Sequence, residues 1–453
     1  MKIIIAGGGK VGASLIRQLT TEGHEITLVD SSTDVLEEIM EQYDIIAVQG
    51  NAASMDVLSQ AGAEDANLVI AATDMDEVNL LCCMTAHVMN PDLHTIARIR
   101  NPEYRNQTYL MRDRFALNMV INPEEEAAKE IARLLQLPGF LKIDMFAKGS
   151  NEIAELKITA DSPIKGVPLN KLSSVVRSQV LICAVQRDGQ CIMPDGNFVL
   201  KENDIAYVTA SQANLASLLD NLHILSRKVK QVMIVGGGKI SYYLAKELEN
   251  SGIRATIVEK SEKRCQELAT VLPEVTVVQG DASSQEFLDS EGIENFDALV
   301  TLTGMDELNI VMSLYGHARK VPAVITKLSH AENNRILDAL PIGSDISPKE
   351  LICSSLVRYV RAMQNKEGAA VTVHMIANGQ GEAMEFIVDE ETKHIGEPLR
   401  DLKIKSNVLV VSISRGWSSE LPDGGSKFQL GDTVVIVTND DSKILQLNDI
   451  FED

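Results

Sequence analysis

Three glycines near the start of the chain have the types and spacing of a phosphate-binding turn. Gly7, Gly9 and Gly12 form G-x-G-x-x-G between an apolar run at 3–6 and a helical pattern of apolar residues. In such a turn Gly7 allows the chain to reverse, Gly9 lets a phosphate approach the backbone, and Gly12 lets the helix pack close to the strand. The helix start offers free N–H groups to a diphosphate. The predicted contacts of this turn are Gly7, Gly8, Gly9, Lys10, Val11 and Gly12.

An acidic residue stands where a bound ribose would lie. Asp30 ends the second apolar run, and its carboxylate can accept hydrogen bonds from both ribose hydroxyls. A 2′-phosphate there would meet a like charge, so NAD is favoured over NADP. The alternative is that Asp30 caps the following helix. Ser31 or Ser32 could form that cap instead, which would leave Asp30 free.

Other polar residues follow the ends of later predicted strands. Asn51 either bonds an adenine edge or caps a helix, and Thr73 with Asp74 lies at the tip of the fourth strand. Arg98 lies within a strand pattern, so its charge needs a partner, which a bound phosphate would supply. The alternative partner for Arg98 is Asp74 or Glu77.

The chain contains one unit used twice. Gly236 follows Gly7 by 229 residues (236 − 7), and VQGNAAS at 48–54 matches VQGDASS at 278–284. Thr-x-Met-Asp-Glu-x-Asn at 73–79 returns at 303–309. The second set of predicted contacts is Gly236, Gly237, Gly238, Lys239, Ile240, Glu259, Asp281, Thr303 and Lys327.

The second set departs from the first at several positions. Ser241 stands in place of Gly12, which makes close packing of the helix less assured. Lys327 replaces Arg98 and loses its two-pronged fork, and Gly304 replaces Asp74. Altered ligand preference or weaker binding is therefore expected in the second half. Lys10 and Lys239 either reach a phosphate or lie at solvated helix starts.

Each repeat divides into two parts. In the first, strands predicted at 2–6, 25–29, 45–49, 68–72, 95–99 and 118–121 alternate with helices at 11–22, 33–42, 54–61 and 77–88. This alternation predicts an α/β, doubly wound parallel sheet of order 3-2-1-4-5-6. The second part has hairpin turns, such as Arg187-Asp188-Gly189, typical of a small α+β module. The expected domains are two Rossmann-type domains at 1–123 and 230–348 and two small modules at 140–225 and 368–453.

The sequence carries no convincing catalytic constellation. Tyr242-x-x-x-Lys246 has the spacing of a dehydrogenase pair, but it lies on the helix directly after the second glycine turn. HExxH, G-x-S-x-G and C-x-x-C are absent. The six cysteines are expected to be buried free thiols, with no metal site. We expect no enzyme, with a duplicated NAD-dependent oxidoreductase as the alternative.

Composition narrows the partners. The net charge of −22 and the 4% of aromatic residues disfavour binding to nucleic acid or to an anionic lipid surface. The start of the chain lacks the pattern of a secretory signal, and no apolar run reaches ~18 residues. Any membrane association is therefore expected to go through another protein.

With these motifs, the whole chain resembles the regulator-of-K⁺-conductance (RCK, or KTN) family of Trk potassium-uptake regulatory subunits. Two glycine-turn domains, each followed by a module with G-x-P-L and P-D-G, carry the resemblance over the whole chain. It implies tandem N and C lobes and a homotetrameric ring on the cytoplasmic face of the inner membrane. That ring would dock on a membrane-embedded K⁺-translocating subunit and gate it. The implied ligands are NAD⁺, NADH and adenine mononucleotides such as ATP and ADP, which would shift the ring between two shapes.

Overall fold

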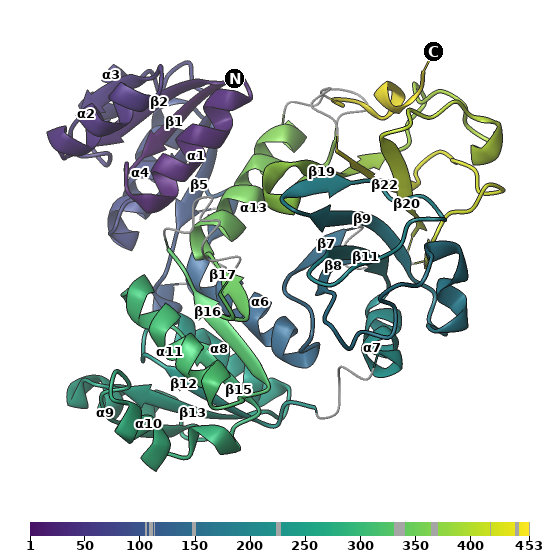
Figure 1. Ribbon diagram of the computed structural model, residues 1–453. Coiled ribbons are helices and arrows are strands. Elements are labelled where there is room, and N and C mark those ends of the chain that lie inside the picture. The colour runs from purple at the N-terminus through teal and green to yellow at the C-terminus, as the bar shows by residue number, and fades with distance from the viewer. Residues whose placement is uncertain are drawn as a thin grey trace. The chain divides into compact units, whose positions relative to one another are not determined.

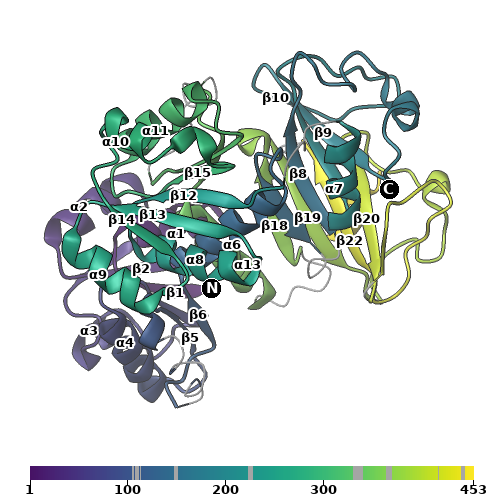
Figure 2. The same ribbon diagram turned by 90° about the horizontal axis from the view of Figure 1, so that it is seen from below.

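The computed structural model describes two compact units. The residues it describes are 1–104, 107, 112, 114–146, 151–222, 228–329, 340–363, 370–416, 418–439 and 444–452. Unit 1 consists of Met1–Ala128 and Ser347–Val360, and unit 2 consists of Lys129–Ile346 and Arg361–Asp453. Figures 1 and 2 show the elements of each unit in two views.

Unit 1 is built on a six-stranded parallel sheet of order β3-β2-β1-β4-β5-β6, which confirms the predicted order. Its strands are β1 (Lys2–Ala6), β2 (Glu25–Asp30), β3 (Ile46–Gln49), β4 (Leu68–Ala71), β5 (His94–Arg98) and β6 (Met119–Ile121). Its helices include α1 (Lys10–Thr21), α2 (Thr33–Gln42), α3 (Met55–Gln60) and α4 (Asp76–Met89). The doubly wound α/β fold predicted from the alternating pattern is confirmed.

Apolar residues hold the helices of unit 1 to this sheet. All four residues of β4 are buried, as expected for a strand covered on both faces. On α1 the predicted apolar positions Val11, Leu15 and Leu19 are all buried. Burial of one such leucine contributes roughly 1.5–3 kcal/mol. This packing fixes the start of α1 above the carboxyl ends of the strands.

A helix from much later in the chain also packs in unit 1. Helix α13 (Pro348–Met363) follows the second parallel sheet in sequence, yet its residues up to Val360 belong to unit 1. The Cys353 thiol lies 3.9 Å from the carbonyl oxygen of Val11. The Tyr359 hydroxyl is 2.8 Å from Nδ1 of His94. Up to Val360, helix α13 therefore packs in the same unit as the first parallel sheet.

Unit 2 contains the second parallel sheet, with the same strand order, β14-β13-β12-β15-β16-β17. Its strands are β12 (Gln231–Val235), β13 (Arg254–Glu259), β14 (Thr276–Gln279), β15 (Ala298–Thr301), β16 (Ala323–Lys327) and β17 (Ser344–Ile346). Its helices include α8 (Lys239–Asn250), α9 (Glu262–Val271), α10 (Gln285–Ser290) and α11 (Asp306–Ala318). The last turns of α6 (Pro123–Gln136) lie in this unit, where Gln136 Nε2 donates to Ser251 Oγ at 3.3 Å.

The two small modules are antiparallel sheets in unit 2. The first has the order β10-β9-β11-β8-β7 and the second has the order β18-β19-β22-β20-β21. Their strands are β7 (Ile143–Phe146), β8 (Asn151–Lys157), β9 (Leu181–Arg187), β10 (Gln190–Ile192), β11 (Ile205–Ala210), β18 (Thr372–Ile376), β19 (Gly381–Ile387), β20 (Val408–Arg415), β21 (Ser418–Glu420) and β22 (Thr433–Thr438). The predicted hairpin joins β9 and β10 through Asp188 (φ 53°) and Gly189 (φ 77°). The first module also contains α7 (Gln212–Asn221).

One hydrophobic core joins the two small sheets. It contains Phe146 and Tyr207 from the first module and Val411 and Val435 from the second. The hydroxyl of Tyr207 accepts a hydrogen bond from the backbone N–H of Ala377 at 2.8 Å. Figure 2 shows the two sheets face to face. The modules therefore stabilise each other as one sandwich.

A buried ion pair lies on the edge strands of this sandwich. Asp144 on β7 pairs with Ile153, and His374 on β18 pairs with Ala383, so the two residues hold equivalent places in the repeats. His374 Nδ1 lies 3.0 Å from Asp144 Oδ1, and Lys142 Nζ lies 3.1 Å from Asp144 Oδ2. Burial alone would raise the pKa of Asp144, but Lys142 and His374 outweigh it and hold that pKa well below its usual range.

Two further expectations concerned the burial of the cysteines and the lack of a membrane-spanning segment. All six cysteines are free thiols, and four of them are buried. Cys191 and Cys265 are only partly buried, so the expectation of burial is wrong for these two. Among the described residues, no helix is both long and apolar enough to cross a bilayer.

The Asp144 pair predicts a pH-dependent contribution to stability. Asp144→Asn should lower the free energy of unfolding by about 3 kcal/mol at pH 7, because it removes the buried anion that bonds Lys142 and His374. A depressed pKa contributes stability above the ordinary pKa of about 3.9, and this stability is lost as the pH falls below it. Urea titrations at several pH values should therefore show the difference kept down to about pH 4 and narrowing below it. Asp161→Asn, at an exposed position, is the control, and equal losses from both variants would contradict the prediction.

Candidate functional site

The first glycine turn has the geometry that a phosphate-binding turn needs. Gly7 has φ +101°, and a Cβ there would lie 2.9 Å from the backbone nitrogen of Thr73. A Cβ on Gly12 would lie 1.9 Å from the carbonyl oxygen of Gly7. A Cβ on Gly9 would meet nothing within 4 Å. The turn is thus closed toward the protein at Gly7 and Gly12 and open at Gly9, where α1 begins.

Asp30 is fixed beside this turn by backbone donors. Its Oδ2 accepts from the N–H of Gly8 at 2.7 Å, and its Oδ1 accepts from the N–H of Ser32 at 2.8 Å. Ser32 caps α2 by accepting from the N–H of Val35, so Asp30 is not that cap. The expectation that Asp30 would then be free is wrong, because both carboxylate oxygens already accept one bond. Each keeps a further lone pair that a ribose hydroxyl could use.

The remaining predicted contacts of the first crevice differ in their exposure to solvent. Lys10 is exposed at the start of α1, whereas Val11 is buried. Gly8 is covered by Val35, whose Cγ1 would lie 2.5 Å from a Cβ at that position. Asn51 is exposed, and its Oδ1 accepts from the N–H of Ala53 at 3.0 Å, so its side chain oxygen shapes the turn before α3.

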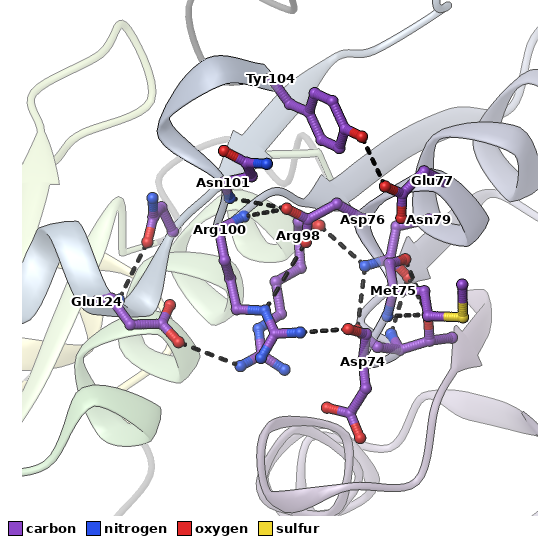
Figure 3. A network of polar contacts seen from close by, with 12 residues as sticks. Asp74, Met75, Asp76, Glu77, Asn79, Arg98, Arg100, Asn101, Tyr104 and Glu124 are labelled. Carbon is purple, nitrogen blue, oxygen red and sulfur yellow. Dashed lines mark hydrogen bonds and ion pairs between the residues drawn. The ribbon is translucent and has the colours of Figure 1, made fainter. Parts of the chain in front are cut away.

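A buried asparagine holds the ends of β4 and β5 together. Asn79 Oδ1 accepts from the N–H of Thr73 at 2.9 Å and from the Thr73 hydroxyl at 2.7 Å. Its Nδ2 donates to the carbonyl oxygen of Arg98 at 2.9 Å. Asp76 Oδ2 accepts from the N–H groups of Arg100 and Asn101 at 2.9 and 2.8 Å. Figure 3 shows this network. Thr73 and Arg98 are therefore positioned by α4 as well as by the sheet.

Arg98 has a partner that the sequence did not suggest. Its Nη2 lies 3.7 Å from Oε1 of Glu124, in the first turn of α6. The expected partners were Asp74 and Glu77, but Glu77 instead accepts from the hydroxyl of Tyr104 at 2.7 Å. Burial lowers the pKa of the Arg98 guanidinium, and Glu124 opposes that shift. Arg100 also contacts this region, donating from Nη2 to the carbonyl oxygen of Asp74.

The second crevice repeats the glycine turn of the first. Gly236 has φ +100°, and a Cβ on Gly238 would meet nothing within 4 Å. Glu259 accepts from the N–H of Gly237 at 2.7 Å and from the N–H of Ser261 at 2.8 Å, as Asp30 does in the first crevice. Ser241 fits in place of Gly12 by donating its hydroxyl to the carbonyl oxygen of Gly236. Lys239 is exposed and Ile240 is buried, like Lys10 and Val11.

Cations are placed differently in the second crevice. Lys327 Nζ donates to the carbonyl oxygen of Thr303 at 2.7 Å. Lys260 Nζ lies 2.7 Å from Oδ2 of Asp281, and this bond, with those from Ser283, holds the pKa of Asp281 below its usual range. Arg264 Nε donates to the carbonyl oxygen of Gly237 at 2.7 Å. Two of these cations, Lys260 and Arg264, therefore follow β13, the strand that ends at Glu259.

Each predicted set therefore lies at the carboxyl edge of its own sheet. The sequence had matched Asp76 and Asn79 with Asp306 and Asn309 but had assigned them no role; their repetition was the available signal. Glu124, Arg100, Lys260 and Arg264 were missed. Tyr242 and Lys246 form a cation–π contact along α8, with Nζ 4.6 Å from the ring centroid. The described part of the chain holds no cluster of His, Cys, Asp and Glu suited to a metal ion.

Comparisons with known proteins identify the family. A model described as the TrkA-N domain matches residues 3–123 and 232–348, and one described as the TrkA-C domain matches residues 153–223 and 383–451. The Trk system potassium uptake protein TrkA of Halomonas elongata is 31% identical, with 100% of this chain and 99% of that protein covered.

Solved structures show the same fold. The crystal structure of the GsuK RCK domain superposes with a TM-score of 0.63 at 19% identity and covers 97% of this chain and 92% of that chain. The GsuK channel bound to NAD gives a TM-score of 0.62 at 19% identity, covering 97% of this chain and 76% of that chain. The sequence relatives are named as potassium uptake proteins and not as enzymes, so the oxidoreductase alternative falls. The chain belongs to the TrkA family of Trk-system potassium uptake proteins, with two TrkA-N and two TrkA-C domains.

Proposed function

We propose that this protein is a nucleotide-sensing regulatory subunit of a potassium uptake system. Its two crevices bind NAD⁺ or NADH, or the adenine nucleotides ATP and ADP, without transforming them. The observation that carries the proposal is the open space above Gly9 and Gly238, each at the N-terminus of a twelve-residue helix. Backbone N–H groups and the positive end of the helix dipole favour a diphosphate at such a place.

Each predicted side chain has a part in this proposal. The diphosphate would lie against 7–12 in the first crevice and 236–240 in the second. Asp30 and Glu259 would accept the ribose hydroxyls with their remaining lone pairs. Asn51 and Asp281 would border the adenosine, while Thr73, Asp74, Arg98, Thr303 and Lys327 would border the far end of the ligand.

The assembly proposed for this function is a homotetrameric ring. Each repeat would supply one nucleotide-binding domain, 1–123 or 230–348, and one small module, 140–225 or 368–453. The ring would dock on the cytoplasmic face of the inner membrane, against the K⁺-translocating subunit. Support comes from the name of the relatives and from the GsuK channel, which shares the fold and is described as bound to NAD. A ligand would gate the partner by its differential affinity for two ring shapes.

Substitutions in the two glycine turns should separate an effect on nucleotide binding from an effect on folding. Gly9→Ala and Gly238→Ala should each abolish binding at their own crevice, because the new methyl group occupies the space where a phosphate would approach. Neither should lower the melting temperature measurably, since each φ (−65° and −72°) suits alanine and the methyl group meets no protein atom. Calorimetric titration with NADH and with ATP should show half of the wild-type stoichiometry, or loss of one of two affinities.

Gly7→Ala is the matched control for folding. Its positive φ and its contact with Thr73 predict a loss of roughly 1–3 kcal/mol in stability. Wild-type protein that binds none of NAD⁺, NADH, ATP and ADP would refute the proposed function. Unchanged binding in the double variant Gly9→Ala/Gly238→Ala would refute the assignment of the crevices.

The gating part of the proposal predicts a functional consequence. When the protein is reconstituted with its membrane partner in potassium-loaded vesicles, nucleotides should change the rate of potassium flux. In the double variant the flux should no longer respond to any nucleotide, although co-purification with the partner is kept. A flux that responds equally in wild type and double variant would show that regulation does not pass through the crevices.

A further inference from the structure

We propose that the buried charged side chains around Glu130 make a pH-dependent contact between the end of helix α6 and the first small module. Uptake of one proton by Glu130 strengthens the packing of α6 against β7, and release of that proton weakens it. Residues 129–136 of α6 belong to unit 2 together with β7, β8 and β18, so the contact lies within one unit. It concerns protons alone and does not depend on a bound nucleotide.

Glu130 is a buried acid with few hydrogen-bond donors around it. Its side chain is 9% exposed, and its Oε2 accepts a hydrogen bond from Nη1 of Arg133, one turn further along α6, at 2.5 Å. Its Oε1 is buried and has no hydrogen-bond partner among the residues that the structure describes. An ionised carboxylate can accept about four hydrogen bonds. Ionisation of Glu130 in this place is therefore costly.

Charged groups from three strands surround this part of α6. Lys142 Nζ lies 3.1 Å from one oxygen of Asp144, and His374 Nδ1 lies 3.0 Å from the other. The charged and titratable groups that interact with Glu130 or with its partners are Arg133 on the same helix, Lys142 and Asp144 at β7, Glu152 and Glu155 on β8, and His374 on β18. With Glu130 this set holds four carboxyl groups and two permanent cations. One added proton therefore reduces a buried excess of negative charge.

Glu130 is the member of this set that exchanges a proton near neutral pH. Burial raises the pKa of Glu130 to about 7, although the cation of Arg133 opposes the shift. An ordinary glutamate would be ionised throughout the neutral range. Asp144 differs, because Lys142 and His374 outweigh its burial and hold its pKa below the usual range. The charge of Asp144 thus stays fixed while that of Glu130 changes.

The position of Glu130 makes its charge affect how α6 is held. Helix α6 ends at Gln136 and β7 begins at Ile143, so a short connection joins them. Ile131 and Leu134 in the same turns are buried with Glu130. Ionised Glu130 gains hydration only when these turns move away from β7, whereas neutral Glu130 has little to gain. A high pH therefore loosens the end of α6, and a low pH tightens it.

The second repeat has a different pair at the equivalent place. Helix α13 begins 225 residues after α6 (348 − 123), and the same shift places Ser355 and Arg358 where α6 has Glu130 and Arg133. Arg358 Nη2 donates to Ser355 Oγ at 3.4 Å, so the arginine is kept and a hydroxyl replaces the acid. A serine hydroxyl does not titrate in the neutral range. The pH-dependent contact is therefore a property of the first repeat.

The first test compares the full-length wild type with Glu130→Gln, which keeps the shape of the side chain and takes up no proton. A pKa raised by folding adds stability that is present below the ordinary value of 4.5 and is lost as the pH rises to about 7. In urea titrations, the unfolding equilibrium constant of the wild type should rise relative to that of Glu130→Gln by about 70-fold between pH 5 and pH 8. Asp144 and His374 are present in both proteins, so their titration cancels in this ratio.

Hydrogen exchange tests the contact itself. After correction for the intrinsic exchange rate, the amides of 131–137 should be less protected at pH 8 than at pH 6 in the wild type. In Glu130→Gln their protection should be the same at both pH values. Strand β12 at 231–235, in the centre of the second parallel sheet, is the internal reference. Equal protection of 131–137 at the two pH values in the wild type would overturn the proposal.

Arg133→Gln adds a test of direction, because it removes a cation that favours the ionised form. The midpoint of both pH effects should move upward by about one pH unit. Glu37→Gln, at an exposed position of α2, is the control and should keep the wild-type pH dependence. If the melting temperature shows that Glu130→Gln does not fold, Glu130→Met, which also lacks a titrating group, takes its place. A pH dependence that survives without Glu130, or a midpoint that ignores Arg133→Gln, would refute the proposal.

Discussion

The close contact between α1 and β1 is the constraint on which each crevice depends. In the first repeat a Cβ at Gly12 would clash with the carbonyl oxygen of Gly7, so this position of the helix needs a glycine there. This contact directs the first N–H groups of α1 to the open space at Gly9. The second repeat solves the same problem with a serine whose hydroxyl bonds the carbonyl oxygen that it approaches. The position of the helix start is therefore kept by a glycine in the first repeat and by a serine in the second.

Around this constraint the two repeats share their fixed parts and differ in their charges. Asn79 and Asn309 make the same bonds to a threonine and to the end of the neighbouring strand. Asp30 and Glu259 likewise accept matching backbone N–H groups. Asn79 and Asn309 are fully buried, and Asp30 and Glu259 accept from backbone N–H groups, so the loss of these contacts would cost stability in either repeat. The cationic side chains differ between the two halves, with Arg98 and Arg100 in the first and Lys260, Arg264 and Lys327 in the second.

The sequence was sufficient to predict the glycine turns and the strand order, because both depend on local spacing and on the duplicated pattern. It could not identify Glu124 as the partner of Arg98, since nothing local marks which acid meets a buried base. It also placed Asp30 correctly but missed that both of its oxygens are used, which depends on the path of the backbone. The sequence could not predict the packing of α13 in unit 1 for a similar reason. An apolar helix face shows that a partner exists but not which one.

The contrast between the glycine turn and the Arg98–Glu124 pair bears on how a bound nucleotide could change the conformation of the protein. A ligand shifts an equilibrium between two conformations only by the difference in its affinity for them. Contacts to the glycine turn are the same in any conformation that preserves α1 on β1, so they supply affinity without a difference. Arg98 and Glu124 differ from them because their pair is long and, in the part of the chain that the structure describes, Arg98 Nε and Glu124 Oε2 have no hydrogen-bond partner. Glu124 also begins α6, whose later turns belong to unit 2. Under the proposed function, a ligand that contacted Arg98 would act on this long pair, whereas contacts to the rigid glycine turn would not distinguish two conformations.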